Sequence, residues 1–179
     1  MKISLQNTTP SENYDVLTKA VLPRPLLWVL SEAEEGFAIA PYSFTNIVST
    51  QPPLVSLAFG IRPGQEQKGP YKALHEKKKA VLHLANEDQK DDILKSGAKG
   101  SFYLNEEKLV HEVEGFPPRL KGCPVAMFCT YYDTMDIKNA NTHLVICKVE
   151  HIFIDEKFED NRHPLTCVGA TGVVTLHSK

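Results

Sequence analysis

Short apolar runs separated by turns, with few helices between them, are the feature that most constrains the fold of this chain. Only two segments, Tyr71–Lys79 and Glu87–Lys95, show helical patterns, so strands and helices do not alternate as they do in parallel sheets. We therefore predict a mainly β protein whose strands form an antiparallel Greek-key barrel with a few helices packed outside it. The predicted strands cover Leu26–Ser31, Gly36–Ala40, Pro53–Gly60, Ala80–Ala85, Val125–Asp133, Thr142–Asp155 and a strand pair within Pro164–Leu176.

The composition is that of an ordinary globular protein and argues against several classes of function. The 179 residues are 42% hydrophobic and 23% charged, which suits a single domain over residues 1–179. A net charge of −2 gives no reason to expect a nucleic-acid partner, because such proteins usually carry a basic face. No apolar run approaches the roughly 18 residues that span a bilayer, and the first residues lack the apolar core of a signal peptide. We expect a cytoplasmic protein without a membrane partner.

Residues that often carry chemistry are present, but their spacing does not predict a catalytic or metal site. The four cysteines, at positions 123, 129, 147 and 167, form no C-x-x-C pair, and buried free thiols are expected in a reducing compartment. The histidines lack the spacing of zinc ligands. We therefore predict no catalytic side chain and no metal ligand.

The segment PYSFTNIVSTQPP, residues 41–53, places small polar side chains in what reads as a connection between two predicted strands. Hydroxyl groups and free backbone N–H groups in such a connection can form an anion-binding site. Lys68, at the end of the loop after the next strand, could supply the positive charge that a phosphate prefers. Tyr42 and Phe44 offer apolar faces to a planar ring, and Asn46 offers both a donor and an acceptor to a ring edge that mixes nitrogen and oxygen atoms.

An alternative interpretation of the same segment needs no ligand. Ser, Thr and Asn side chains often hydrogen-bond their own backbone, and Phe44, Ile47 and Val48 would then belong to the core. The chain contains neither G-x-G-x-x-G nor G-x-x-x-x-G-K-[ST], so no phosphate-binding motif decides between the two interpretations.

The run PRPLLWVLSEAEEGFAIAPYSFTNIVSTQPPLVSLAFG resembles the flavin reductase-like FMN-binding split-barrel family. That family shows P-R-P-I-A-W-V-S-T, a short loop with glycine, then N-L-A-P-Y-S-F-F-N-A-V-S and P-P-L-V. Weaker similarity continues in KGPYKAL, HLVICKVEHIFID and PLTCVGATG. The matching residues of the first run are Pro23, Arg24, Pro25, Trp28, Gly36, Ala40, Pro41, Tyr42, Ser43, Phe44, Asn46, Val48, Ser49, Pro52 and Pro53.

The resemblance implies a six-stranded split barrel, a homodimer, and FMN held near the subunit interface. It places the phosphate near Ser49 and Thr50, with Lys68 as the counter-charge. Arg24 is a further candidate for the phosphate or the interface, and the alternative is a surface turn residue. The residues implied to contact the isoalloxazine and the ribityl chain are Tyr42, Ser43, Phe44 and Asn46.

The chain departs from the family pattern at residues that bear on this prediction. Lys68-Gly69-Pro70 replaces a K-D-T triplet and so loses an acid and a hydroxyl beside the expected phosphate. Pro70 cannot donate an N–H, although it suits the first turn of a helix. His83 stands where the family often has Asn; we predict a buried core residue, with a place at the flavin edge as the alternative. His163 is read as a loop residue, with a nicotinamide contact as its alternative.

Two classes of function follow from the resemblance. In the first, NAD(P)H stacks on bound FMN and passes hydride to it, and the reduced flavin serves an electron acceptor that the sequence does not identify. Hydride transfer requires no protein acid or base, because the cofactor supplies the chemistry. In the second, the protein stores FMN or passes electrons between protein partners without a nicotinamide reaction of its own. We favour the first, and the sequence does not select between NADH and NADPH.

Overall fold

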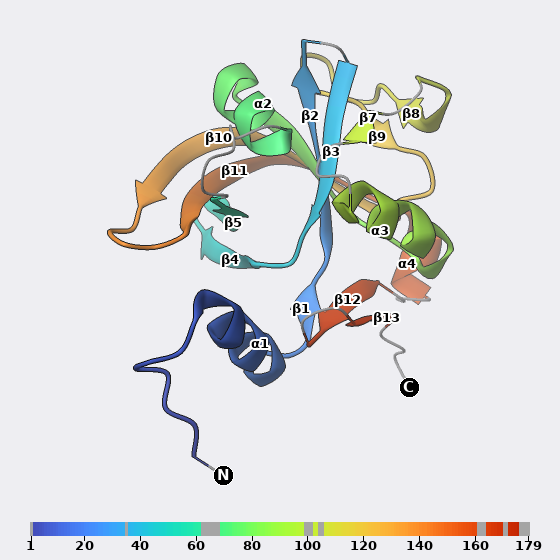
Figure 1. The fold of residues 1–179 in the computed structure, drawn as a ribbon. Coiled ribbons are helices and arrows are strands. Elements are labelled where there is room, and N and C mark those ends of the chain that lie inside the picture. The colour runs from blue at the N-terminus through green and yellow to red at the C-terminus, as the bar shows by residue number, and fades with distance from the viewer. Residues whose placement is uncertain are drawn as a thin grey trace.

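An antiparallel sheet rolled into a barrel forms the centre of the molecule (Figure 1). The computed structural model describes residues 2–34, 36–61, 69–98, 102–103, 106–160, 164–169 and 172–175. The strands are β1 (Arg24–Pro25), β2 (Leu27–Ala33), β3 (Gly36–Tyr42), β4 (Thr45–Thr50), β5 (Pro53–Gly60), β6 (Lys79–Leu84), β7 (Phe102–Tyr103), β8 (Leu109–Val110), β9 (Arg119–Leu120), β10 (Val125–Asp136), β11 (Thr142–Ile154), β12 (Leu165–Val168) and β13 (Gly172–Thr175). The helices are α1 (Pro10–Ala20), α2 (Pro70–Lys77), α3 (Lys90–Ala98) and α4 (Glu156–Asp160), with 3₁₀ turns η1 (Glu87–Gln89) and η2 (Glu106–Lys108). Within the described residues the main sheet has eight strands in the order β4-β5-β11-β10-β6-β2-β3-β7, and smaller sheets join β1-β12-β13 and β8-β9.

The main sheet must be rolled because a short segment of chain connects two strands that lie near opposite ends of the strand order. β3 and β4 are six positions apart in the strand order. In a flat sheet that separation would be about 29 Å, at about 4.8 Å per strand. Only Ser43 and Phe44 separate the two strands in sequence, and the chain from Tyr42 to Thr45 reaches at most about 11 Å. The backbone N–H of Ala58 in β5 donates to the Phe44 carbonyl at 2.9 Å, so the β4–β5 pairing extends into this junction.

Strand β2 is buried on both faces of the sheet, which explains its continuous apolar sequence. Leu27 and Val29 belong to the barrel core, whereas Trp28 and Leu30 belong to a second core with Ile93 of α3. Side chains alternate between the two faces of a strand, so each face of β2 meets a different core. The barrel core consists of Leu27, Val29, Val55, Leu57, Phe59, Leu74, Ala80, Leu82, Cys129, Val145 and Cys147.

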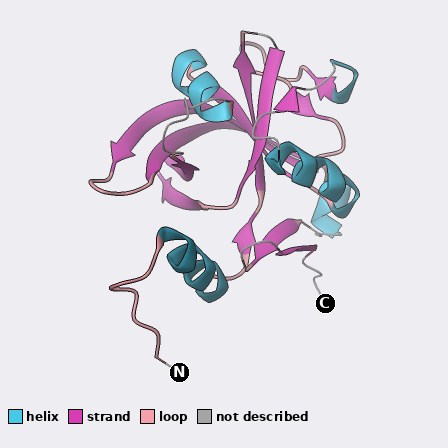
Figure 2. Cartoon of the chain, viewed as in Figure 1, coloured by secondary structure: helices cyan, strands magenta, loops and turns pink. Residues whose placement is uncertain are grey.

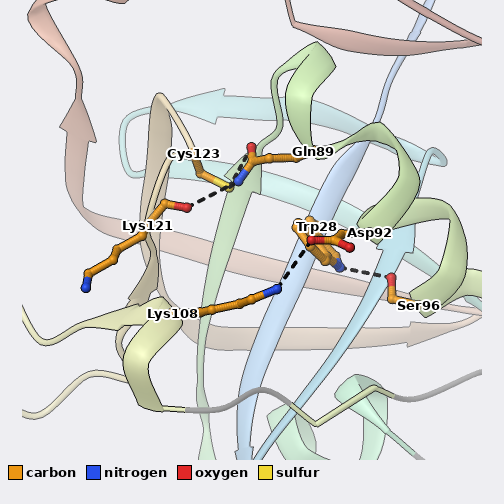
Figure 3. A network of polar contacts seen from close by, with 7 residues as sticks. All are labelled: Trp28, Gln89, Asp92, Ser96, Lys108, Lys121 and Cys123. Atoms are coloured by element: carbon orange, nitrogen blue, oxygen red, sulfur yellow. Dashed lines mark hydrogen bonds and ion pairs between the residues drawn. The ribbon is translucent and has the colours of Figure 1, made fainter.

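Helix α3 packs on β3 and is tied to the second core by buried polar contacts (Figure 3). The Nε1–H of Trp28 donates to Ser96 Oγ at 3.0 Å, and the Ser96 hydroxyl donates to the Ile93 carbonyl at 2.7 Å. A Cβ atom added at Gly97 would lie 2.9 Å from Cγ of Pro41 in β3. The helix therefore approaches the strand at a distance that only glycine allows without a shift.

Helix α1 precedes the barrel and lies next to β1 and the segment that enters β4 (Figures 1 and 2). The Thr9 side chain accepts from the N–H of Glu12, and the Glu12 carboxylate accepts from the N–H of Thr9 at 2.7 Å. This capping box, with Pro10 in the first turn, explains where the helix starts. The predicted elements did not include α1, although Thr9 and Glu12 carry the spacing of that motif.

The predicted strands are present, but the 41–53 segment is not the connection that we predicted. β3 continues to Tyr42, and most of the remaining residues form β4, which is an edge strand. The pattern did not reveal this strand because Asn46, Ile47 and Val48 are all exposed, and the pairing with β5 shifts register between Ile47 and Ser49. The main sheet therefore has more strands than the six expected, while the mainly β, antiparallel class is confirmed.

Both predicted helices are present with shifted ends. α2 begins at Pro70, which confirms the expected proline in a first turn. The second helix starts as a 3₁₀ turn after Asn86, whose backbone N–H donates to Gln89 Oε1 at 3.1 Å. α3 then continues to Ala98, three residues beyond the predicted end at Lys95. None of the helices in the described residues has the length and apolar composition that a membrane crossing requires.

Candidate functional site

Large apolar side chains are exposed on β4 and at the residue that precedes it. Ile47 is 73% exposed, Val48 51% and Phe44 38%. The alternative interpretation that placed these three residues in the core is therefore wrong. The predicted residues that the structure brings together at the end of β3 and along β4 are Tyr42, Ser43, Phe44, Asn46, Ser49 and Thr50.

The polar side chains of β4 are only partly engaged by their own backbone. Asn46 Oδ1 accepts from the N–H of Ile47 at 2.9 Å, and Ser49 Oγ accepts from the N–H of Gln51 at 3.1 Å. Hydrogen bonds to nearby backbone therefore engage the side-chain oxygens of Asn46 and Ser49, as the alternative interpretation expected. Among the described residues no partner is found for the amide NH₂ of Asn46, and the exposed Thr50 hydroxyl lies one residue further along the strand edge from Ser49. These groups remain available to an external ligand.

The first turn of α2 is not capped by a side chain. Its N-cap is Gly69, in a backbone conformation with φ of 78° that favours glycine, and Pro70 follows at the first helical position. The backbone N–H groups of Tyr71 and Lys72 then stand at the positive end of the helix dipole, where anions are stabilised. Lys68 precedes this turn but lies outside the described residues, so its role as a counter-charge stays a prediction.

Aromatic rings connect the start of α2 to the barrel. The Tyr71 ring stacks on His143 of β11 with a centroid distance of 4.9 Å and an interplanar angle of 17°. Its centroid lies 5.3 Å from that of Phe59, and Phe59 lies 4.5 Å from Tyr42 in an edge-on arrangement. Tyr42 thus packs against the barrel core. Burial, followed by the charge of Asp136, raises the pKa of Tyr71, so its phenol is neutral at physiological pH.

Arg24 is buried rather than placed in a surface turn. Only 6% of its surface is exposed. Its guanidinium donates to the carbonyls of Thr18 at 2.6 Å and Val21 at 3.0 Å, at the end of α1, and to the carbonyl of Gly169 at 2.7 Å. The guanidinium carbon lies 5.8 Å from the centroid of the Phe44 ring. The predicted contact of Arg24 with phosphate or a partner subunit stays a prediction, and its alternative role as a surface turn residue is wrong.

His83 is a buried core residue, as predicted. Its Nδ1 lies 2.9 Å from the Trp28 carbonyl, and its Nε2 accepts from the backbone N–H of Leu120 at 3.0 Å. These partners require the neutral tautomer that carries its proton on Nδ1. Burial lowers the pKa of His83 to about 4, against the opposing effect of the bond to Trp28. His163, the other histidine considered above, lies outside the described residues.

The cysteines are free, as predicted, and three of them are buried. Burial raises the pKa of Cys123 and of Cys147 to about 12, and it raises the pKa of Cys129 well above its ordinary value. These thiols stay protonated at neutral pH and are poor nucleophiles. Cys123 instead contacts the amide of Gln89, which also donates to the Lys121 carbonyl (Figure 3).

One aromatic neighbour of the site was absent from the prediction. The Tyr14 ring of α1 stacks on Phe44 with centroids 5.8 Å apart and an interplanar angle of 26°. The capping motif before α1 indicates a helix there, but no local pattern indicates which strand the helix meets. The contact depends on the fold of the intervening chain.

Known proteins similar to this chain point to one family. An uncharacterised protein of Aquifex aeolicus is 26% identical over 96% of this chain and 92% of its own length. Nitrilotriacetate monooxygenase component B from Bacillus cereus has a similar crystal structure, with a TM-score of 0.85 and 25% identity over 100% of this chain and 96% of that one. An FMN-binding protein from Thermus thermophilus shares the fold, with a TM-score of 0.77 and 15% identity over 100% and 97% of the two chains. The profile of the flavin reductase like domain matches residues 19–170, so the resemblance is confirmed and this chain belongs to the flavin reductase like domain family.

Proposed function

We propose that this chain is an oxidoreductase that binds FMN and passes hydride from NAD(P)H to the bound flavin. The observation that carries the proposal is the solvent exposure of β4, whose exposed residues include the apolar Ile47 and Val48 and the polar Asn46 and Thr50. A flavin nucleotide presents the matching combination of an apolar ring system, polar ring edges and a hydroxylated chain. Membership of the flavin reductase like domain family supports this choice, and so does the FMN-binding protein that shares the fold.

The donor groups of this region fit FMN. The Phe44 ring would face the isoalloxazine, and the Asn46 amide would bond a polar edge or the ribityl chain. The hydroxyls of Ser49 and Thr50 would approach the phosphate, whose charge would be balanced by Lys68 and by the uncapped first turn of α2. When bound, FMN supplies the two-electron chemistry, and the side chains bind, orient and shield it.

The absence of an acid or base from β4 is compatible with this role. None of the side chains of Thr45–Thr50 is ionisable. Hydride transfer from a nicotinamide to a flavin needs no proton transfer from the protein, in contrast to hydrolytic chemistry. Residues of β4 then act by holding the ring in place, so their replacement should change binding more than the pH dependence of the reaction.

The proposal includes a homodimer in the cytoplasm. Exposed apolar side chains that a second copy of the chain would cover are Leu17 of α1, Val21 just after this helix, and Ile47 and Val48 of β4. The four free cysteines favour a reducing compartment. The proposal also includes an electron acceptor, whose chemical class it does not specify. The hydride donor is NADH or NADPH.

Titrations with FMN and with riboflavin, which lacks the phosphate, test this arrangement. Lys68→Ala should weaken FMN about tenfold, as expected for loss of a charge-assisted contact, and leave riboflavin unchanged. Asn46→Ala should weaken both ligands alike, by about fivefold, because it contacts groups that both contain. Equal losses for Lys68→Ala, or an unchanged riboflavin affinity for Asn46→Ala, would contradict the assigned roles.

Steady-state oxidation of NADH or NADPH in the presence of FMN tests the reaction itself. We expect turnover with at least one nucleotide. The Asn46→Ala variant should lose turnover at FMN concentrations below its raised dissociation constant for FMN. Tight FMN binding without oxidation of either nucleotide would instead identify an electron-transfer or flavin-storage protein, which is the second candidate.

A further inference from the structure

Arg24 holds a buried charge that bonds only carbonyl groups among its described neighbours. The guanidinium donates to two carbonyls at the end of α1, from Thr18 and Val21, and to the Gly169 carbonyl beside β12. Within the described part of the chain no carboxylate forms an ion pair with it, and its buried Nε has no partner. Carbonyls at a helix C-terminus carry partial negative charge, so they stabilise the cation there. Arg24 therefore joins α1 to the β1-β12-β13 sheet.

The same geometry leaves Arg24 badly placed to bind a phosphate. With 6% of its surface exposed, the side chain would have to leave at least one of its carbonyl partners to meet an external anion. Each abandoned carbonyl would then lose a charge-assisted hydrogen bond. If the guanidinium stays in its present position, it keeps all three hydrogen bonds to carbonyl groups.

In that position Arg24 lies close to Phe44, whose ring is proposed to face the flavin. Its guanidinium carbon lies 5.8 Å from the Phe44 centroid, within the range of a cation–π contact. Phe44 also stacks on Tyr14 of α1, the helix that Arg24 holds in place. The Phe44 carbonyl accepts from the N–H of Ala58, and Tyr14 and Arg24 both lie against its ring. The residue is 38% exposed.

We propose that Arg24 is a positioning residue of the flavin site, which holds α1 and the Phe44 ring in the orientation that the isoalloxazine meets. The proposal rests on the proposed FMN-binding function and assigns Arg24 no contact with the phosphate. An aromatic ring that is already fixed loses less side-chain freedom when a ligand binds. Arg24 thus raises the affinity for the ring system that FMN and riboflavin share.

The test compares FMN and riboflavin affinities in Arg24→Met, Phe44→Ala and the double variant. Arg24→Met should weaken both ligands by about fivefold and leave their ratio unchanged, since only the ordering of Phe44 is lost. In the Phe44→Ala background, Arg24→Met should produce no further loss, because a residue that acts through Phe44 has nothing left to position. Arg119→Met is the matched control. Arg119 lies in β9, and its guanidinium carbon is 3.7 Å from the centroid of the Phe153 ring. Its replacement should leave both affinities unchanged.

Several results would overturn the proposal. A loss confined to FMN would show that Arg24 contacts the phosphate, and an undiminished loss in the Phe44→Ala background would show that it acts elsewhere. Equal losses in Arg24→Met and Arg119→Met would indicate general destabilisation. If Arg24→Met does not fold, Arg24→Lys retains the charge without the planar fork and should give a smaller loss shared by both ligands; unchanged affinities would contradict the proposal. Failure of the unaltered protein to bind either flavin would refute the proposed function itself.

Discussion

His83 should make the protein less stable as the pH falls from 7.5 to 5. The imidazole is fully buried, and burial holds its pKa at about 4, compared with 6.5 for an ordinary histidine. Between these two values the unfolded chain binds a proton that the folded chain does not bind. The contribution is therefore present above about pH 6.5, decreases as the pH falls, and is lost near pH 4.

The magnitude follows from the two pKa values. One pKa unit corresponds to 1.36 kcal/mol, so the full loss is about 3 kcal/mol, of which about 2 kcal/mol is lost by pH 5. This is a large share of the roughly 5–15 kcal/mol that stabilises a typical domain. The cause is structural: a protonated ring could no longer accept the N–H of Leu120 at Nε2.

Urea unfolding at pH 7.5, 6 and 5 measures this effect, with the fluorescence of the single tryptophan, Trp28, as the probe. His83→Gln is the comparison, because glutamine offers a donor and an acceptor but does not titrate. The stability advantage of the unaltered protein over this variant should shrink by about 2 kcal/mol between pH 7.5 and 5. Other titrating groups are common to both proteins and cancel. Parallel stability curves would refute the assignment of a buried neutral imidazole.

Three further predictions concern buried contacts and are checked by the same unfolding measurement. Ser96→Ala should lower the unfolding free energy by about 1–3 kcal/mol, because it leaves the buried Nε1–H of Trp28 without its acceptor. Ser31→Ala should leave stability unchanged or raise it by up to about 1 kcal/mol, because the buried Ser31 hydroxyl has no partner among the described residues. Gly97→Ala should cost about 1–3 kcal/mol, since the contact with Pro41 outweighs the helix propensity gained. A marked loss in Ser31→Ala, or stabilisation in either other variant, would contradict these contacts.

The sequence carries enough information to predict the parts of the fold that depend on local pattern. The apolar run at β2 predicted a strand, and its burial on both faces explains why that run is continuous. His83, surrounded by apolar neighbours, was predicted to lie in the core, and two backbone partners satisfy it there. The family resemblance then predicted that the segment with Phe44 and Asn46 contacts the cofactor.

The remaining features depend on contacts between distant parts of the chain. The Arg24 guanidinium bonds Gly169, which is 145 residues away in sequence, so no local pattern reveals its burial. β4 was not recognised as a strand because the consecutive residues Asn46, Ile47 and Val48 are all exposed and so show no alternation, and a register shift interrupts the strand at Val48. The stacking of Tyr14 on Phe44 likewise requires the position of α1, which the barrel determines.

The central claim is that this chain binds a flavin and accepts electrons from a nicotinamide. Its most direct test is the visible absorption spectrum of the purified protein with FMN, followed by anaerobic addition of NADH and, separately, NADPH. We expect a protein-bound flavin spectrum that bleaches with at least one of the two nucleotides. A bound flavin that stays oxidised with both would contradict the proposed reaction, and a protein that does not bind FMN would contradict the site itself.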